Sequence, residues 1–382
     1  MLYFDHCAST PPHEDVVRTL SEIMTRHYAN PSSLHRAGIE AERLIARARE
    51  VLAGVFGVSP AEWVFTSSGT ESNNLAIFGA ARAMQHRGRH LITSPTEHAS
   101  VYETFRQLER EGYEVSWLPV DRQGRIDPQA LAQSIREDTT LVSLMHVNNE
   151  TGAVQPISEL AAVLAEHPRV LFHVDAVQSV GKLPVMLRPW RIDLLTLSPH
   201  KLRGPKGTGI LYVREGVRLQ PLLFGGSHEA GRRAGTANTA GIVTSVKAVR
   251  LAVESQAERA QRMGRLGERL RRRLADAQGI VLTKVDAAPH IVHLCCPSLK
   301  SEVIVHLLEQ EGFLVSTQSA CSSKSGQPSR VLQAMRLERP LAESGIRISF
   351  GDEHTESDID RLADALERAV ARLQQLEEGR GE

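Results

Sequence analysis

The chain has 382 residues, of which 41% are hydrophobic and 24% charged, as expected for a globular protein of one or two domains. Its 45 basic and 45 acidic residues balance, so the charge gives no reason to expect nucleic acid or an anionic membrane as the main partner. The chain shows no signal peptide at MLYFDHCASTPP, no membrane-spanning stretch and no C-x-x-C spacing among its four cysteines, which predicts a cytoplasmic protein with reduced thiols.

After a short extended start, apolar residues recur at helical spacing over 14–28 and 34–56. From residue 63 onward, short apolar strands alternate with helical segments. The predicted strands are 63–68, 90–95, 113–120, 140–147, 170–176, 192–199 and 209–213. The predicted helices between them are 71–88, 100–112, 127–138 and 157–167. This alternation predicts an α/β architecture with a largely parallel, buried sheet.

A long helix with a polar face is predicted over 241–277, and it leads into a second unit. The strands predicted in that unit are 291–296, 313–317 and 345–350, and its helices are 301–312 and 357–376. The chain has no repeats and no low-complexity linker, so we expect the second unit to pack closely against the first.

The segment FTSSGTESNN at 65–74 ends a predicted strand in a Ser/Gly/Thr turn and then begins a helix. The unpaired N–H groups of such a turn, together with the Thr70 hydroxyl, can bind a phosphate. An ordinary helix N-cap with Glu71 in the first turn explains the same residues. The segment is not a Walker A motif.

Asp175, in FHVDAVQS at 172–179, follows another predicted strand. A carboxylate there needs a partner, because burying an unpaired charge is costly. A protonated pyridine nitrogen would serve. So would an arginine, or the N–H groups at the start of the next helix.

Two of the chain's seven lysines fall in SPHKLRGPKGTG at 198–209, again at the end of a predicted strand. Lys201 directly follows the strand, where partial desolvation lowers the pKa of an amine and makes it a competent Schiff-base former. Lys206 fits a surface loop, whereas Ser198 and His200 can donate to a phosphate. A phosphate-binding turn, an acidic strand end and a lysine strand end on one sheet are together what pyridoxal 5′-phosphate (PLP) needs.

These motifs stand in an order that resembles a known family, the cysteine desulfurases of the class V aminotransferase family, of the nitrogen-fixation and housekeeping iron–sulfur type. The motifs that carry the resemblance, nearly end to end, are YFDHCAST, NPSSLH, FTSSGTESNN, TEHAS, HVNNETG, HVDAVQS, SPHK–GPKG, GRRAGT, SAC and GIRISF. The resemblance implies the PLP-dependent transferase fold of type I. Its large domain, over 12–255, would hold a mainly parallel seven-stranded sheet. A smaller α+β domain would cover 256–382, with 1–11 packing against it.

The resemblance also implies roles for individual residues. Lys201 would form the Schiff base with the cofactor, Asp175 would hold the proton of the pyridine nitrogen, and Gln178 would bond the phenolic oxygen. His98, in TEHAS, would stack on the ring and shuttle protons. The residues implied to surround the phosphate are Gly69, Thr70, Ser198 and His200.

Further implied residues lie outside the strand ends already described. Asn149 and Arg347 would bind the substrate carboxylate, and Asn149 would also contact the cofactor; a bidentate Arg–carboxylate pair fixes orientation. Asn30, in NPSSLH, resembles an active-site residue near that carboxylate. Thr236 resembles the residue that reaches the phosphate from the neighbouring subunit, which implies a homodimer.

Cys321, in SACSSKSGQPS at 319–329, decides the reaction that the resemblance implies. Such a cysteine attacks the sulfur of the bound cysteine, keeps it as a persulfide and passes it to an acceptor. A free cysteine is more commonly a small buried hydrophobic residue, but the polar Ser/Gly-rich surroundings argue for an exposed, reactive thiol. Lys324 could lower its pKa, and whether Cys321 also ligates a transferred cluster stays open.

Three departures from the family pattern limit what the resemblance implies. His6-Cys7 replaces the usual polar pair after Asp5, Thr151 replaces a common aliphatic residue, and Ala230 stands where an arginine is usual. We interpret Cys7 as structural. Cys295 and Cys296 are predicted to lie in the core, and no Cys/His cluster predicts a metal site.

The sequence therefore predicts a PLP-dependent homodimeric sulfurtransferase that converts L-cysteine to L-alanine and a Cys321 persulfide. Its acceptor would be a protein such as an iron–sulfur scaffold or a thiolation enzyme, and no contact with a membrane or directly with nucleic acid is expected. Selenocysteine lyase, another class V aminotransferase-type enzyme and a non-catalytic partner-binding scaffold are the alternatives. The sequence leaves open the acceptor, the preference for cysteine over selenocysteine and the effect of Ala230.

Overall fold

The computed structural model of the chain describes residues 1–317 and 328–378, so the predicted nucleophile Cys321 and its neighbour Lys324 lie outside the described residues. Within those ranges, no helix combines the length and the apolar character that a membrane crossing requires.

A seven-stranded sheet in the order β2-β8-β7-β6-β5-β3-β4 forms the centre of the fold. The strands are β2 Trp63–Thr66, β3 His90–Thr93, β4 Glu114–Trp117, β5 Thr139–Met145, β6 Leu171–Asp175, β7 Leu194–Leu197 and β8 Gly209–Val213. Neighbours from β7 to β4 pair in parallel, and β8 runs antiparallel to both β7 and β2. The predicted mainly parallel α/β sheet is confirmed, and six strands end at the same edge.

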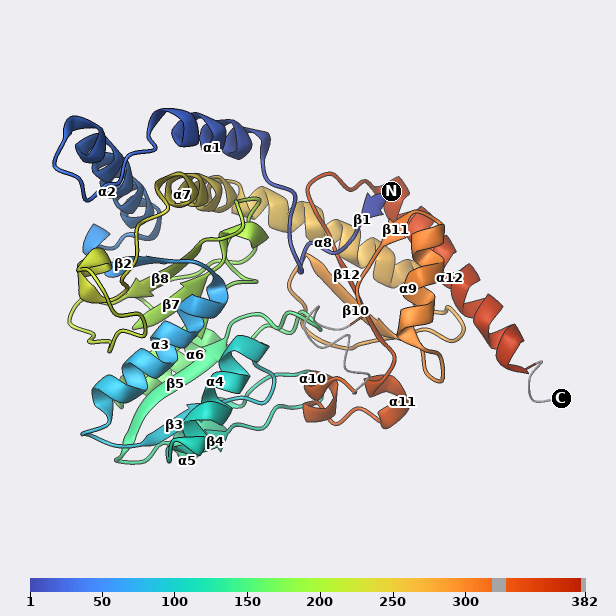
Figure 1. Cartoon of the computed structure of the whole chain (residues 1–382). Coiled ribbons are helices and arrows are strands. Elements are labelled where there is room, and N and C mark those ends of the chain that lie inside the picture. Colours follow the sequence, from blue (N-terminus) through green and yellow to red (C-terminus); the bar gives the residue numbers. More distant parts are fainter. Residues whose placement is uncertain (318–327, 379–382) are drawn as a thin grey trace.

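Helices cover both faces of this sheet (Figure 1). They are α1 Glu14–Arg26, α2 Arg36–Phe56, α3 Gly69–Met84, α4 Ala99–Arg110, α5 Pro128–Ser134, α6 Ile157–Ala165 and α7 Thr239–Glu254. One apolar cluster joins α3 and α4 to the sheet, with Ile77 and Phe105 at its centre. A second joins α2, α6 and α7 to the opposite face. Because both faces are buried, the strands are nearly continuous apolar runs.

The second unit is built on a small antiparallel sheet in the order β12-β10-β9. Its elements are α8 Gln256–Arg273, β9 Val281–Leu282, β10 Ile291–Cys295, α9 Ser301–Gln310, β11 Phe313–Leu314, β12 Gly345–Ser349 and α12 Glu356–Glu378. The first strand of the chain, β1 Leu2–Tyr3, pairs in parallel with β11. The start of the chain is therefore part of the unit formed by its end (Figure 1).

The single helix predicted over 241–277 is wrong in detail. Two helices occupy this stretch, because α7 ends at Glu254 and α8 begins at Gln256. Between them, the Ser255 hydroxyl donates to the carbonyl oxygen of Leu251 at 2.7 Å. Such a bond from a serine back to the preceding turn competes with the regular helical pattern.

The division into 12–255 and 256–382 stays a prediction, and two observations support it. The helix break at Ser255 coincides with the proposed boundary. The second unit also has an apolar cluster of its own, which includes Phe4 from the start of the chain. Two short helices within 256–382 do not follow this division. α10 Arg330–Ala334 and α11 Arg339–Ala342 add side chains to the apolar cluster that joins α2, α6 and α7 to the large sheet.

Phe4 is the residue whose truncation tests how firmly the N-terminal segment is held. Its ring is fully buried, stacks on His354 at 4.0 Å and contacts Phe313 and Phe350. We expect Phe4→Ala to lower the free energy of unfolding by about 3–5 kcal/mol, the cost of emptying a buried aromatic site. Urea unfolding followed by circular dichroism measures the change.

Leu376→Ala is the control for this measurement, because the Leu376 side chain is 57% exposed on α12. Leu376→Ala should lower the free energy of unfolding by less than about 1 kcal/mol. Equal losses in the two variants would contradict a firmly packed N-terminal segment.

Candidate active site

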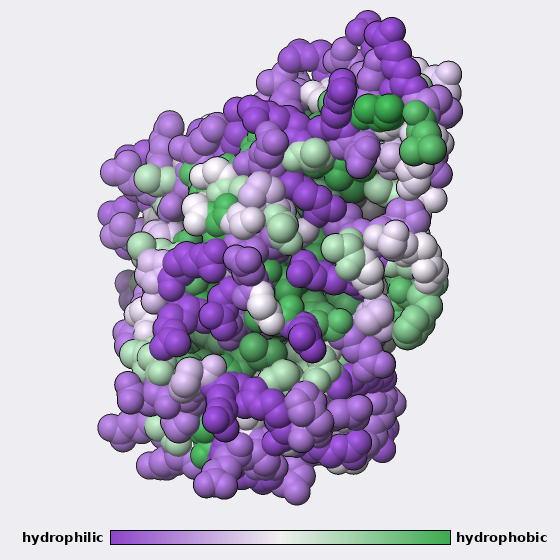
Figure 2. All heavy atoms as spheres, turned by 90° about the vertical axis from the view of Figure 1, so that its left-hand side faces the viewer, coloured by the Kyte–Doolittle hydropathy of each residue, from purple (hydrophilic) through white to green (hydrophobic). Residues whose placement is uncertain are grey.

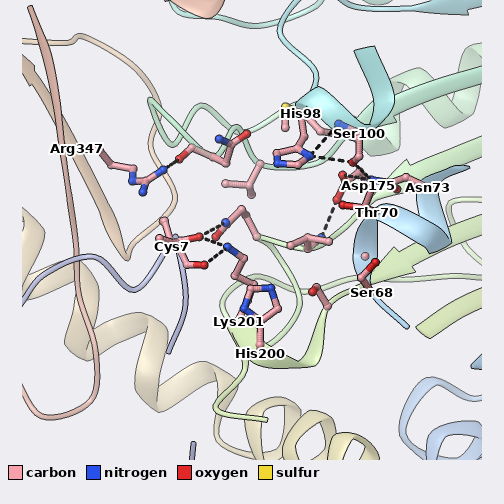
Figure 3. Close-up of a pocket in the computed structure, with 18 residues that line it drawn as sticks. Cys7, Ser68, Thr70, Asn73, His98, Ser100, Asp175, His200, Lys201 and Arg347 are labelled. Atoms are coloured by element: carbon pink, nitrogen blue, oxygen red, sulfur yellow. Dashed lines mark hydrogen bonds between the residues drawn. The ribbon is translucent and has the colours of Figure 1, made fainter. Parts of the chain in front are cut away.

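A cavity of about 260 Å³ opens at the edge where the parallel strands end. Ten of the predicted site residues line it: Gly69, Thr70, His98, Asn149, Asp175, Gln178, Ser198, His200, Lys201 and Arg347. They come from the ends of β2, β3, β5, β6 and β7 or from the segments that follow these strands and, for Arg347, from β12 of the second unit. The cavity therefore lies at the junction of the two units (Figure 3).

The N-terminus of α3 forms one wall of the cavity. Ser68 caps the helix, and its hydroxyl accepts the N–H of Glu71 at 3.1 Å. A Cβ atom on Gly69 would lie 3.1 Å from the Ser198 Cβ, so glycine lets the turn after β7 approach the helix closely. Because this 16-residue helix begins at the cavity, the backbone N–H groups of its first turn can bind an anion there.

Asp175, at the end of β6, is buried and its carboxylate accepts two hydrogen bonds. The Val177 N–H donates to Oδ1 at 3.0 Å, and the Asn73 side-chain amide donates to Oδ2 at 2.9 Å. No arginine pairs with Asp175 within the described ranges. The carboxylate is thus oriented by neutral donors, which leaves it available to a cationic partner in the cavity.

The Lys201 amine, in the turn after β7, reaches across the cavity to the N-terminal segment. It donates to the carbonyl oxygens of Cys7 and of Ala8, the latter at 2.6 Å. The Gln178 amide donates to the same Cys7 carbonyl at 3.1 Å (Figure 3). Cys7, interpreted as structural from the sequence, is in fact part of the cavity wall.

Lys182 lies behind the lysine-bearing turn and donates to the Lys201 carbonyl oxygen at 3.1 Å. Burial lowers the pKa of Lys182 to about 7, an effect to which the charges of Arg259 and Lys201 add.

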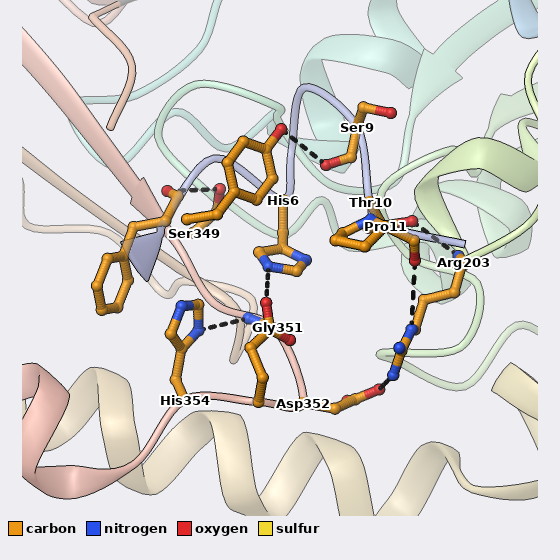
Figure 4. Close-up of polar contacts among 12 residues, drawn as sticks. His6, Ser9, Thr10, Pro11, Arg203, Ser349, Gly351, Asp352 and His354 are labelled. Atoms are coloured by element: carbon orange, nitrogen blue, oxygen red, sulfur yellow. Dashed lines mark hydrogen bonds and ion pairs between the residues drawn. The ribbon is translucent and has the colours of Figure 1, made fainter. Parts of the chain in front are cut away.

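The N-terminal segment that receives Lys201 is itself held from two sides (Figure 4). The Ser349 hydroxyl, at the end of β12, accepts the Cys7 N–H at 2.9 Å. On the other side, the Thr10 hydroxyl donates to the His200 carbonyl oxygen at 2.7 Å. Residues 7–10 therefore bridge the second unit and the lysine-bearing turn.

His6, Glu353 and His354 bring three possible metal-ligand atoms within 4.8 Å of one another beside this segment. The His6 Nε2 is already hydrogen-bonded to Glu353 at 2.7 Å, and His354 Nδ1 accepts the Gly351 N–H at 2.9 Å (Figure 4). These contacts use the lone pair of His354 and tie the N-terminal segment to the loop after β12.

Arg347 is buried on β12 and is oriented by groups of the protein. Its Nη1 donates to the Asn149 carbonyl oxygen at 2.8 Å, and its Nη2 donates to Asp5 at 2.7 Å. Although burial lowers the pKa of Arg347, the neighbouring Cys7 and Asp5 raise it overall. Its Nε has no hydrogen-bond partner among the described residues. The guanidinium is thus a permanent cation in the wall of the cavity, and its Nε is a buried donor that no described residue uses.

The two histidines of the cavity are neutral at pH 7. Burial lowers the pKa of His98, and the charges of Lys201 and Arg330 act in the same direction. Burial lowers the pKa of His200 to about 4, with Lys201, Lys206 and Lys182 adding to the effect. Both rings are therefore hydrogen-bonding groups in this cavity and add no positive charge.

Two predicted residues lie outside the cavity of their own chain. Asn30 is exposed, and its side-chain oxygen accepts the Ser32 N–H at 2.9 Å. Thr236 is exposed in the loop before α7. The Arg233 guanidinium ties that loop to Glu71 of α3 at 2.8 Å.

Sequence reasoning missed Cys7, Asn73 and Ser100, which also line the cavity. Asn73 follows Gly69 by four residues on one helix, so their shared face could have been predicted from helical spacing. Ser100 stands two residues after His98, the spacing of a capping contact. Cys7 gave no comparable local signal.

The fold and the lysine-bearing cavity define an α/β enzyme of the transferase type. The Aminotransferase class-V family model matches residues 2–362, so the chain belongs to the class-V aminotransferase family.

Individual relatives are more specific. The cysteine desulfurase IscS of Escherichia coli is 42% identical over 382 residues, which cover 98% of this chain and 94% of the relative. A solved structure of a NifS-like protein is 36% identical with a TM-score of 0.91, and the match covers 97% of this chain and 99% of that one. A structure of SspA in complex with cysteine is 35% identical with a TM-score of 0.79, over 92% and 99% of the two chains. The resemblance seen in the sequence is confirmed.

The lowered pKa of Lys182 predicts how stability depends on pH. Between pH 7 and about 10 the folded chain has lost the Lys182 proton, whereas the unfolded chain keeps it. The free energy of unfolding should therefore rise with pH in this window, by up to about 1.4 kcal/mol per unit from this residue, and level off above it. Urea unfolding at several pH values should show that the free energy of unfolding rises less steeply with pH in Lys182→Met than in the unmodified protein.

Lys284→Met is the matched control, because Lys284 is an exposed lysine of the second unit. Its slope should equal that of the unmodified protein. If the free energy of unfolding of Lys182→Met depends on pH as strongly as that of the unmodified protein, the buried Lys182 amine keeps its proton and the prediction is wrong.

Proposed function

We propose that the chain is a PLP-dependent cysteine desulfurase, which converts L-cysteine to L-alanine and keeps the sulfur as a persulfide on Cys321. One observation carries the proposal: the Lys201 amine and the Asp175 carboxylate reach one cavity from neighbouring strand ends. The names of the relatives and the SspA complex with cysteine support the choice of substrate.

The chemistry of the residues that line the cavity fits PLP. The α3 N-terminus, Ser198 and the neutral His200 suit its phosphate, and Gly69 leaves the close approach that this requires. Lys201 would hold its aldehyde carbon, and the oriented Asp175 carboxylate its protonated ring nitrogen. When bound, PLP supplies an electron-withdrawing ring that stabilises negative charge next to the substrate α-carbon.

The chain's own residues then bind, orient and move protons. Arg347 and Asn149, which both line the cavity, would bind the substrate carboxylate at the side of the second unit. To receive the cofactor, the Lys201 amine exchanges its bonds with the carbonyl oxygens of Cys7 and Ala8. With PLP and the substrate bound, the Lys201 amine would take up and return the α-proton of the substrate.

The sulfur-transfer step is assigned to Cys321. Its thiolate attacks the substrate sulfur, so that an S–S bond forms, the Cβ–S bond breaks, and the electron pair left on Cβ takes a proton to give alanine. An acceptor protein, such as an iron–sulfur scaffold or a thiolation enzyme, then receives the persulfide sulfur. We place the enzyme in the cytoplasm, where reducing conditions keep such a thiol free.

We propose a homodimer on three observations. The Ser32 hydroxyl contacts His228 at 3.4 Å, so the turn with Asn30 lies beside the loop with Thr236. Tyr28, Leu34 and Phe224, in or next to these segments, are at least 80% exposed. The left-hand side of the molecule exposes hydrophobic side chains among polar ones (Figure 2). A second copy on this surface would cover apolar area and add Thr236 to the partner's cavity.

Two variants test the desulfurase proposal. After loading with PLP, the unmodified protein should be yellow and should form alanine and sulfide from L-cysteine and a thiol reductant. Cys321→Ser should stay yellow but lose both products by at least about 100-fold, as expected for loss of a nucleophile. Lys201→Ala should lack the visible band of the lysine-bound cofactor.

Lys206→Ala is the matched control for Lys201→Ala, since Lys206 is an exposed lysine in the same segment. It should behave like the unmodified protein. A yellow protein that forms neither alanine nor sulfide would refute the desulfurase proposal and point to another amino-acid substrate.

The dimer proposal makes a complementation prediction. Light scattering should give about twice the 42.1 kDa mass of the chain. Lys201→Ala and Thr236→Asp homodimers should both be inactive. A co-purified heterodimer of the two variants has one cavity with both native residues, so about half of the native activity should return. Activity of a heterodimer no higher than that of its parents would contradict a contribution of Thr236 across the interface.

A further inference from the structure

Four polar side chains beside the cavity form one chain of hydrogen bonds (Figure 3). The Asn73 amide nitrogen lies 2.9 Å from Asp175 Oδ2 and 2.9 Å from the Ser100 hydroxyl. That hydroxyl lies 2.8 Å from His98 Nδ1. These bonds thus link the end of β6, the N-terminal parts of α3 and α4, and the histidine that caps α4.

Elementary hydrogen bonding fixes the direction of each contact. The Asp175 carboxylate accepts, so Asn73 must present its NH₂ group there, and both amide hydrogens are then used. The Ser100 hydroxyl accepts one of them and keeps its own hydrogen for His98 Nδ1. This orientation leaves the buried Asn73 carbonyl oxygen without a partner in the described part of the chain, which shows that the carboxylate determines it.

The backbone adds a donor that cannot be reversed. The Ser100 N–H also points to His98 Nδ1, at 3.2 Å, as part of the α4 cap. A hydroxyl can rotate to accept a proton, but a backbone N–H only donates. Nδ1 therefore has two donors directed at it and carries no proton, so the neutral ring must carry its proton on Nε2.

The surroundings of His98 keep the ring neutral and in place. The charged groups that act on it are Asp175 on β6, Lys201 after β7 and Arg330 on α10. Arg330 also donates to the Glu97 carbonyl oxygen at 2.7 Å and stacks on Tyr102 at 3.6 Å. Burial and the two cations outweigh the carboxylate and lower the pKa of His98.

We propose that Ser100 and Asn73 are positioning residues that hold His98 as the Nε2-protonated, neutral imidazole, so that it offers the cavity an N–H donor and not a base. The inference rests on the proposed function only in naming the bound cofactor or substrate as the acceptor. Because Nε2 already carries a proton, His98 cannot take one from the substrate there. The proposal assigns hydrogen-bond donation to His98, where the sequence predicts a proton shuttle, and it assigns proton transfer to the Lys201 amine.

The experiment observes the ring nitrogens directly. Protein labelled with ¹⁵N-histidine, with and without PLP, is studied by NMR between pH 7 and 9, and His98→Gln identifies the His98 signals. We expect Nδ1 to be unprotonated and Nε2 protonated throughout this range. Ser100→Ala should shift the Nδ1 signal and lower kcat about tenfold, the effect of one hydrogen bond, while KM changes less than about twofold.

Three further variants separate positioning from general stability. Ser100→Thr keeps the hydroxyl and should restore both the Nδ1 signal and kcat. Asn73→Ala removes the link to Asp175 and should shift the same signal while Ser100 is intact. Ser143→Ala is the matched control, because the buried Ser143 hydroxyl contacts His173 Nδ1 at 2.7 Å outside the cavity, and it should leave the His98 signals and kcat unchanged.

A proton on His98 Nδ1 in the unmodified protein would overturn the inference. So would His98 signals and kcat that are the same in Ser100→Ala and Asn73→Ala as in the unmodified protein. The NMR result does not depend on turnover, so a protein that forms no alanine would refute the proposed function while still reporting the tautomer of His98.

Discussion

The bonds from the Lys201 amine to the carbonyl oxygens of Cys7 and Ala8 join the two walls of the cavity in this structure. They join the edge of the large sheet to a segment that belongs, through β1 and Ser349, to the second unit. The two units are therefore connected by the reactive group itself. A change that loosens the N-terminal segment disturbs the amine, even when it lies far from the cavity.

Burial decides which charges the cavity retains. Desolvation makes His98 and His200 neutral at pH 7 and weakens the basicity of Lys182, whereas Arg347 remains a cation because Cys7 and Asp5 lie beside it. Neutral imidazoles can donate to an anion or an oxygen without repelling the neighbouring lysine. The cavity thus combines many hydrogen-bond donors with few full charges. Having few charges limits the free-energy cost of burying charged groups away from water.

The sequence predicted much of this arrangement because parallel strands bring their ends together wherever they occur in the chain. Asp175 and Lys201 could be placed at one edge without knowledge of the strand order. The order itself, the reversed direction of β8 and the break at Ser255 depend on packing between distant segments. The contact between Asn73 and Asp175 spans 102 residues, so it becomes visible only once β6 is known to lie beside α3. Exposed Asn30 shows the opposite case, in which a motif resembles a site residue but the chain alone does not bring it to the cavity.

The pairing of β1 with β11 also has a consequence for how the protein is made. The first strand to leave the ribosome finds its partner at residues 313–314, and Phe4 and Cys7 find Ser349 later still. Such contacts between the two ends of a chain form last, because long loops must close first. The seven-stranded sheet can assemble during synthesis, but the pocket around Lys201 is completed only when almost the whole chain has been translated. Premature termination before β12 would therefore yield a chain that contains the large sheet but lacks Arg347 and Ser349, which complete the cavity and hold its N-terminal segment.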